Sequence, residues 1–296
     1  MNARQAVDLR AGTARASIAA VGAELTGWCA GGHELIWQPD PVYWAASSPI
    51  LFPIVGWARD GKIRVGGQAY PMGVHGFAAA SRFDVEQVAP HKARFSLADT
   101  PASRAIYPFR FRLVLDYTLS ETALRVDVAV GNEGDTVMPY ACGLHPGFRW
   151  PFAGGGPDDY AIVFAEPEDP NVPVIAPGGL FSKELRRTPL DGRRLPLSSS
   201  QFAQEAMCFL NARSQSLRFE GSGGSVISVA TEGFPHFALW SRPGAPFLSI
   251  ETWSGHGDPQ GFDGDLYDKP SMIHLPPQRE SRHRATFEFI GGSISG

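Results

Sequence analysis

A histidine and a glutamate that are far apart in the sequence are of the types that could exchange protons with a bound ligand. His145 lies in the segment GLHPGFRW, and Glu251 lies in LSIETWSGHGDP. Each is expected where a strand runs into a turn with aromatic neighbours and few charges. Two titratable groups in different environments are typical of general acid–base catalysis. The pair is therefore predicted to be catalytic; the alternatives are a structural turn histidine and an exposed glutamate.

Aromatic residues near these motifs could hold a ligand. His75 stands in YPMGVHGFA, where Gly76 lets the backbone approach a ligand closely and the ring of Phe77 offers an apolar face. The alternative for His75 is a hydrogen-bonded histidine of the core. Trp253 follows Glu251 by two residues, so it should face the same side of the strand and could stack on a ligand.

Metal and cofactor motifs are absent from the sequence. His236, His256 and His274 show no HxH, HExxH or facial-triad spacing with nearby aspartates. There is also no Walker A motif, no GxGxxG fingerprint after a strand and no GxSxG elbow. No metal and no cofactor are predicted. His91 and His283 lie beside charged residues and are predicted to be solvated.

Composition excludes several classes of partner. Among 296 residues the net charge is -4, which leaves no basic stripe for nucleic acid or an anionic membrane. The three cysteines are widely spaced, so buried reduced thiols are expected. The first residues carry charges and lack the apolar run of a signal peptide, and no segment reaches the ~20 apolar residues that span a bilayer. These features predict a cytoplasmic protein without a membrane partner.

Period-two patterns position the candidate residues on strands. Apolar residues alternate with polar ones from Phe109 to Leu119, and again from Leu124 to Val130 after a turn, which predicts a hairpin. Further strands are expected at Ala93–Leu97, Ser225–Ala230, Phe237–Trp240, Phe247–Thr252 and Ala285–Ile290. One short helix is expected at Gln201–Cys208, and a surface loop at Pro167–Gly179. A single all-β domain over residues 1–296, built as a large antiparallel sandwich, is predicted.

Five segments, in their order along the chain, resemble the aldose 1-epimerase (mutarotase) family, in particular a divergent bacterial branch. These segments are SPILFPIVGWARDGKI, YPMGVHGFA, GLHPGFRW, FAQEAMCF and LSIETWSGHGDP. The resemblance implies a β-supersandwich and interconversion of the α and β anomers of an aldose. It also implies that His145 is the general acid, Glu251 the general base and His75 a substrate-binding histidine.

Two positions depart from the family pattern. Trp57 stands where members with sugar activity usually have a substrate-binding arginine, and Arg59 is a nearby candidate to replace it. Glu205 falls where many members have an aspartate that holds sugar hydroxyls. The complete set of expected substrate-binding residues is His75, Phe77, Trp57, Arg59, Glu205, Phe148 and Trp253.

Two other functions remain open at this stage. A carbohydrate-binding module without catalysis would fit the departures at Trp57 and Glu205. A glycoside hydrolase would need two carboxylates roughly 5–9.5 Å apart, with Glu251 plus Glu205 or Asp258 as candidates. In each case the expected partner is a small sugar.

Overall fold

Strands with alternating burial form the framework of the computed structural model, which describes residues 6–292. In β10 (Phe111–Leu119), every second side chain from Phe111 to Leu119 is buried, and β11 (Ala123–Asn132) continues this pattern. The two strands pair antiparallel with Leu115 opposite Val128, which confirms the predicted hairpin. This alternation gives the sheet one apolar face that must be covered.

Three larger sheets and three two-stranded ribbons make up the fold. The nine-stranded sheet contains, in spatial order, β18 (Arg194–Pro196), β15 (Ala161–Phe164), β20 (Ser216–Glu220), β21 (Val226–Glu232), β25 (Glu280–Ile290), β11, β10, β9 (Lys92–Ala98) and β8 (Asp84–Ala89). The six-stranded sheet contains β19 (Met207–Phe209), β22 (His236–Trp240), β23 (Phe247–Trp253), β13 (Gly143–Leu144) and β5 (Ile50–Leu51), with β14 (Gly147–Arg149) also on β23. The four-stranded sheet contains β1 (Ala6–Ala11), β2 (Ala14–Ala19), β3 (Leu25–Ala30) and β4 (His33–Glu34). The ribbons are β6 (Lys62–Val65) with β7 (Gln68–Pro71), β12 (Met138–Tyr140) with β24 (Ile273–Leu275), and β16 (Asn171–Ala176) with β17 (Leu180–Arg187).

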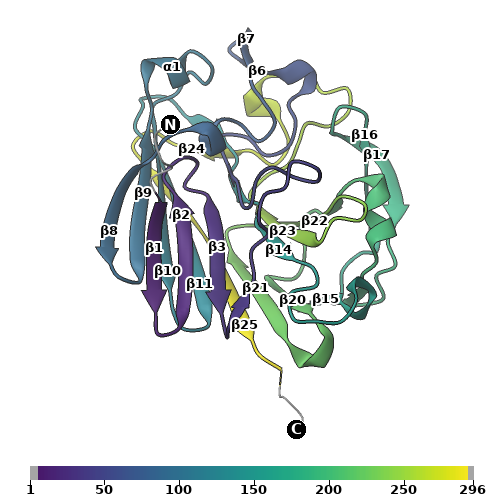
Figure 1. The fold of residues 1–296 in the computed structure, drawn as a ribbon. Helices are drawn as coiled ribbons and strands as arrows, with labels where there is room; N and C mark the ends of the chain where they lie inside the picture. The colour runs from purple at the N-terminus through teal and green to yellow at the C-terminus, as the bar shows by residue number, and fades with distance from the viewer. Residues whose placement is uncertain (1–5, 293–296) are drawn as a thin grey trace.

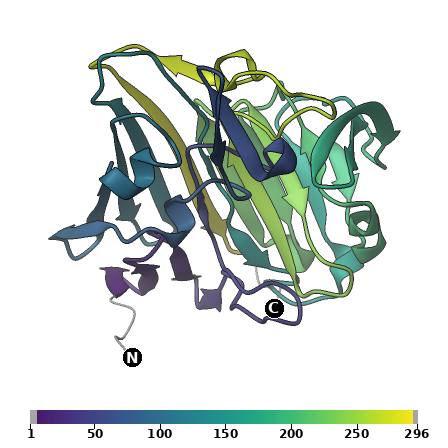
Figure 2. The ribbon, with the colours of Figure 1, turned by 90° about the horizontal axis from the view of Figure 1, so that it is seen from above.

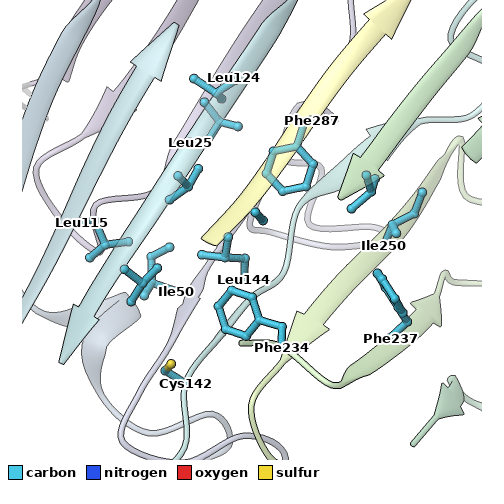
Figure 3. Close-up of a cluster of buried hydrophobic side chains, with 14 of the residues drawn as sticks. Leu25, Ile50, Leu115, Leu124, Cys142, Leu144, Phe234, Phe237, Ile250 and Phe287 are labelled. Carbon is cyan, nitrogen blue, oxygen red and sulfur yellow. The ribbon is translucent and has the colours of Figure 1, made fainter. Parts of the chain in front are cut away.

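The nine-stranded sheet is covered by both smaller sheets. Figure 1 shows β1 to β3, in purple, in front of β8 to β11, while the green strands of the six-stranded sheet lie on the other side of yellow β25. Figure 2 shows the same division from above. In Figure 3, Leu25, Leu115 and Leu124 converge on one side of β25, and Phe237 and Ile250 lie on the other. The architecture is the predicted all-β antiparallel supersandwich.

Helices are few and short. They are α1 (Pro101–Arg104) and the 3-10 turns η1 (Arg59–Gly61), η2 (Ala78–Ala80), η3 (Pro157–Asp159), η4 (Ser199–Gln204), η5 (Ser222–Gly224) and η6 (Leu266–Asp268). Within residues 6–292, no helix has the length and apolar character needed to cross a membrane.

Two expectations about local structure were wrong. The segment Pro167–Gly179 is not only a loop, because β16 lies within it and pairs with β17. The segment Gln201–Cys208 is only partly helical: η4 ends at Gln204, and Cys208 belongs to β19. One buried apolar cluster extends from Leu9 to Phe289. The assignment of residues 1–296 to a single domain stays a prediction.

Candidate active site

Strand β23 carries the candidate base on the face of the six-stranded sheet that points away from the main core. Leu248 and Ile250 pack into the main hydrophobic cluster. Because side chains alternate along a strand, Ser249, Glu251 and Trp253 share the opposite face. All of β23 is buried, and Glu251 is only 2% exposed. A carboxylate is thus placed in an apolar environment by a strand whose other face is anchored in the core.

Strand register brings His145 to Glu251. Leu144 of β13 lies opposite Thr252 of β23, and Gly147 of β14 lies opposite Ser249. His145 and Pro146 join these two short strands, and Ile250 donates its N–H to the carbonyl of Pro146 at 3.1 Å. The register on either side therefore places His145 directly opposite Glu251, where cross-strand side chains meet.

The two side chains are in direct contact. The distance between His145 Nε2 and Glu251 Oε2 is 3.2 Å, and the side chains are 8% and 3% exposed. The indole N–H of Trp253 donates to the same Oε2 at 3.0 Å. A Cβ at Gly143 would come within 2.8 Å of Cδ1 of Trp253. Because Gly143 has no side chain, there is room for the indole of Trp253 to lie against the sheet.

Ser249 contacts the ring nitrogen of His145 that faces away from Glu251. Its Oγ lies 2.8 Å from His145 Nδ1 and donates to the carbonyl of Pro146 at 3.1 Å. A hydroxyl has one proton, so with that proton on Pro146 the oxygen accepts from an N–H at Nδ1. Nε2, which faces Glu251, is then the position that gains and loses a proton.

Burial favours the neutral forms of both members of the pair. Burial lowers the pKa of His145 well below its usual range, and the neighbouring His75 lowers it further. Burial raises the pKa of Glu251 well above its usual range, against the opposing effect of the Trp253 hydrogen bond. A single proton held between the two groups leaves the site without net charge, since it gives either two neutral groups or an ion pair.

His75 approaches the pair from a loop. Its ring meets the ring of His145 edge-on, with centroids 5.5 Å apart. The backbone N–H of Gly56 donates to His75 Nδ1 at 3.1 Å, so Nε2 of the neutral ring carries its proton. Burial lowers the pKa of His75 to about 4. Near neutral pH this side chain is therefore an uncharged hydrogen-bond donor.

A pocket of about 390 Å³ opens above the pair, and this volume suits a small molecule. Its lining residues are Trp44, Pro49, Gly56, Trp57, Val74, His75, His145, Ile175, Gly179, Phe181, Glu205, Ala206, Cys208, Trp240, Arg242, Glu251 and Trp253. Most of the wall is apolar and aromatic, while the polar groups are few and lie on different segments.

Trp57 and Glu205 lie on the pocket wall as expected. The indole of Trp57 is 45% exposed and packs on the β16–β17 hairpin, where a Cβ at Gly179 would overlap its ring. Glu205 is exposed and has a φ of 66°, a left-handed conformation that is uncommon for a residue with a side chain. The guanidinium of Arg186 donates to the carbonyl of Glu205 at 3.1 Å.

Three expected binding residues lie outside the pocket lining. The Phe77 ring packs against Phe52 and other aromatic residues of the core, with centroids 6.1 Å apart. Phe148 is fully buried on the core face of β14 and contacts Phe287. The guanidinium of Arg59 donates to the carbonyl of Gly261 at 3.3 Å and is directed to that loop. The structure therefore does not bring these three residues to the pocket, and their role in ligand binding stays a prediction.

Sequence reasoning missed four residues of the site. Trp44 lies 5.0 Å from the ring of His145, and Trp240 lies 5.6 Å from it, edge-on. Arg242 lines the pocket, and Ser249 contacts His145. Only Ser249 had a usable signal, because it precedes Glu251 by two residues on the same strand face.

Asp258 and Lys269 form a separate buried pair. Asp258 Oδ1 lies 2.9 Å from Nζ of the buried Lys269, and its Oδ2 accepts the N–H of Arg59 at 2.8 Å. It is absent from the pocket lining. Across the part of the chain that is described, no three histidine, cysteine, aspartate or glutamate side chains are grouped in a way that could hold a metal ion.

The fold and this site define a β-supersandwich protein with a buried acid–base pair at the base of an aromatic pocket. A family model described as aldose 1-epimerase matches residues 5–245. The LacX protein encoded on a plasmid of Lactococcus lactis subsp. lactis is 33% identical over 263 residues, covering 85% of this chain and 88% of the relative. This chain belongs to the aldose 1-epimerase family.

Solved structures support the same fold. A galactose mutarotase-like protein from Lactobacillus casei matches with a TM-score of 0.90 and 26% identity, over 97% of this chain and 100% of that one. A galactose mutarotase related enzyme from Lactobacillus acidophilus matches with a TM-score of 0.89 and 26% identity, over 98% and 99%. The galactose mutarotase-like supersandwich is thus shared along nearly the whole chain.

Proposed function

We propose that this protein is an aldose 1-epimerase, which interconverts the α and β anomers of an aldose by opening and reclosing the sugar ring. The observation that carries the proposal is the buried contact of 3.2 Å between His145 and Glu251 at the base of an open pocket. The family match and the names of the solved neighbours support it. The catalytic and binding roles below are part of the proposal.

Ring opening moves two protons. The Glu251 carboxylate takes the proton of the anomeric O1 hydroxyl, while His145 gives its Nε2 proton to the ring oxygen. The C1–O bond of the ring breaks as the carbonyl forms, and the pair changes from an ion pair to two neutral groups. Because burial disfavours both charges, forming the ion pair costs free energy, and ring opening returns the two groups to their favoured neutral forms. After rotation about C1–C2, closure on the other carbonyl face returns both protons.

Neighbouring side chains orient this exchange. Ser249 holds the second nitrogen of His145, so that Nε2 remains the exchanging position. Trp253 donates to Glu251 Oε2 and limits the rise in the pKa of the carboxyl. The protonated Nε2 of the neutral His75 is a donor for a sugar oxygen. The aromatic rings of the pocket wall suit the apolar C–H faces of a sugar.

Polarimetry of freshly dissolved aldoses tests the proposal. General acid–base catalysis is worth ~10²–10⁴-fold per group, so Glu251→Gln and His145→Ala should each slow mutarotation by at least ~100-fold. Glu232→Gln, which changes an exposed glutamate of β21 outside the pocket, is the matched control and should retain the wild-type rate. Wild-type rates in either pocket variant would refute the assignment.

A second candidate is a carbohydrate-binding module without catalysis. It is favoured by Trp57, whose half-exposed indole could stack on a sugar without assisting proton transfer. This function predicts heat of sugar binding in calorimetry and no acceleration of anomer exchange. A glycoside hydrolase would require Glu205 as the second carboxylate, because Asp258 is bound to Lys269 and does not line the pocket. Release of reducing sugar from aryl glycosides would identify it.

A further inference from the structure

We propose that the substrate is an acidic aldose, with a carboxylate on the ring carbon next to the ring oxygen, and that Arg242 binds this carboxylate. The inference rests on the proposed epimerase function and specifies its substrate class. It starts from a residue that no sequence motif indicated. Among the pocket-lining residues of the described chain, Arg242 is the one arginine or lysine.

Arg242 lies over the indole of Trp240 and is exposed. Its Cζ lies 5.6 Å from the ring centroid of Trp240, a cation–π contact that orients the group on the pocket wall. The residue is exposed, and within residues 6–292 no carboxylate oxygen lies within 4.0 Å of its nitrogens. A guanidinium has five N–H donors in a planar fork, and stacking on an indole leaves its edge free to bind.

The position of Arg242 fits a substituent next to the ring oxygen. Trp240 meets the ring of His145 edge-on, with centroids 5.6 Å apart, so it connects His145 to Arg242 along the wall. In the proposed mechanism His145 protonates the ring oxygen. In a pyranose the carbon bonded to that oxygen, opposite C1, carries the exocyclic group. We therefore place that group on the side of the sugar that faces Arg242.

The charges of the pocket favour a carboxylate over a phosphate ester. A planar carboxylate with one charge matches a single guanidinium in a bidentate contact. A phosphate ester carries close to two charges at neutral pH. Within the described part of the chain, no second arginine or lysine lines the pocket, whereas the exposed residue Glu205 does. A neutral hydroxymethyl group would leave the charge of Arg242 without a partner.

Matched sugars test the inference. Polarimetry would compare kcat/KM for D-galacturonate, D-galactose and D-galactose 6-phosphate, and for the corresponding glucose series. A hydrogen-bonded charge pair implies a preference of about 10–100-fold for the uronate over the neutral hexose. Arg242→Gln should bring this ratio close to one, and Arg242→Lys should give an intermediate ratio. Arg10→Gln makes the same change of charge on β1, outside the pocket, and should preserve the preference.

The outcomes separate the two proposals. Equal or better turnover of the neutral hexose in the wild type would overturn the inference, as would a preference for the 6-phosphate or an unchanged ratio in Arg242→Gln. Calorimetry with the uronate gives an independent measurement. Uronate binding that Arg242→Gln abolishes, with no acceleration of any sugar, would support the acidic ligand and refute the epimerase. Acceleration of hexose mutarotation with no preference for the uronate would support the epimerase function and refute the acidic substrate.

Discussion

Removal of the Ser249 hydroxyl should change the pH dependence of the proposed epimerase reaction while both His145 and Glu251 remain in place. In Ser249→Ala, the Nδ1–H of His145 loses its acceptor, which lies 2.8 Å away in the wild type. The neutral ring loses an ordinary hydrogen bond. The imidazolium, which in the proposed mechanism forms before ring opening, loses a bond strengthened by its charge.

The size of the effect follows from that difference. Hydrogen bonds to charged groups contribute about 1.5–3 kcal/mol, and one pKa unit corresponds to about 1.4 kcal/mol. An ordinary hydrogen bond contributes about 0.5–1.5 kcal/mol, so the extra loss to the imidazolium is about 1–1.5 kcal/mol. The pKa of His145, already lowered by burial, should therefore fall further. The same difference applies to the protonated acid in the proposed reaction, so kcat should fall by about 10-fold.

Mutarotation rates measured by polarimetry across the pH range would show this shift. Between the two apparent pKa values the pair holds one proton, so the profile of the wild type should be bell-shaped. The acid limb of Ser249→Ala should move to lower pH, whereas Ser249→Thr, which keeps a hydroxyl, should retain the wild-type limb. Ser214→Ala removes an equally buried serine with two hydrogen bonds outside the pocket, and controls for stability. An acid limb at the wild-type pH in Ser249→Ala would refute the reasoning.

Three further changes have defined outcomes. Gly143→Ala places a Cβ 2.8 Å from Trp253 Cδ1, so it should lower the free energy of unfolding by about 1–3 kcal/mol in urea titration; an unchanged midpoint would contradict the close packing. Burial lowers the pKa of His236 from 6.5 to about 4, so the folded state binds fewer protons than the unfolded state between these values. The free energy of unfolding should thus fall as pH decreases through this range, by up to about 3 kcal/mol from this residue, and His236→Gln should have a flatter pH dependence. Trp57→Ala should change stability by less than about 1 kcal/mol but weaken sugar binding in calorimetry by about fivefold; equal affinity would exclude stacking.

Local patterns predicted much of the framework. The alternation from Phe109 to Leu119 identified β10, because one face of that strand packs on the core and the other meets solvent. The same rule failed for His283, which was predicted to be solvated because Arg282 is its neighbour. Alternation turns His283 inward, where its Nε2 lies 2.9 Å from the hydroxyl of Tyr140. A charged residue next to a given position on a strand indicates that the opposite face of the strand is exposed, because adjacent side chains point to opposite faces.

The composition of the pocket could not be predicted, because it depends on contacts between distant segments. His145 and Glu251 were recognised from their local sequence, but the register that places them opposite each other depends on β13, β14 and β23 pairing. Phe77 looked like a ligand-binding ring in its motif and packs in the core. Arg242 follows Trp240 in an ordinary turn, and nothing in its local sequence indicates a pocket.

The acid–base pair lies on paired strands, whereas residues of the pocket wall lie on connecting segments. His145 and Glu251 face each other across a strand ladder, so hydrogen bonds of the sheet set the distance between them. Arg242 and Trp57 stand on connecting segments, where the backbone can change without altering that ladder. Substitutions at these positions should therefore change which sugar is bound while the proton-transfer geometry is kept. The two positions that depart from the family resemblance, Trp57 and Glu205, both lie on the pocket wall and not in the pair.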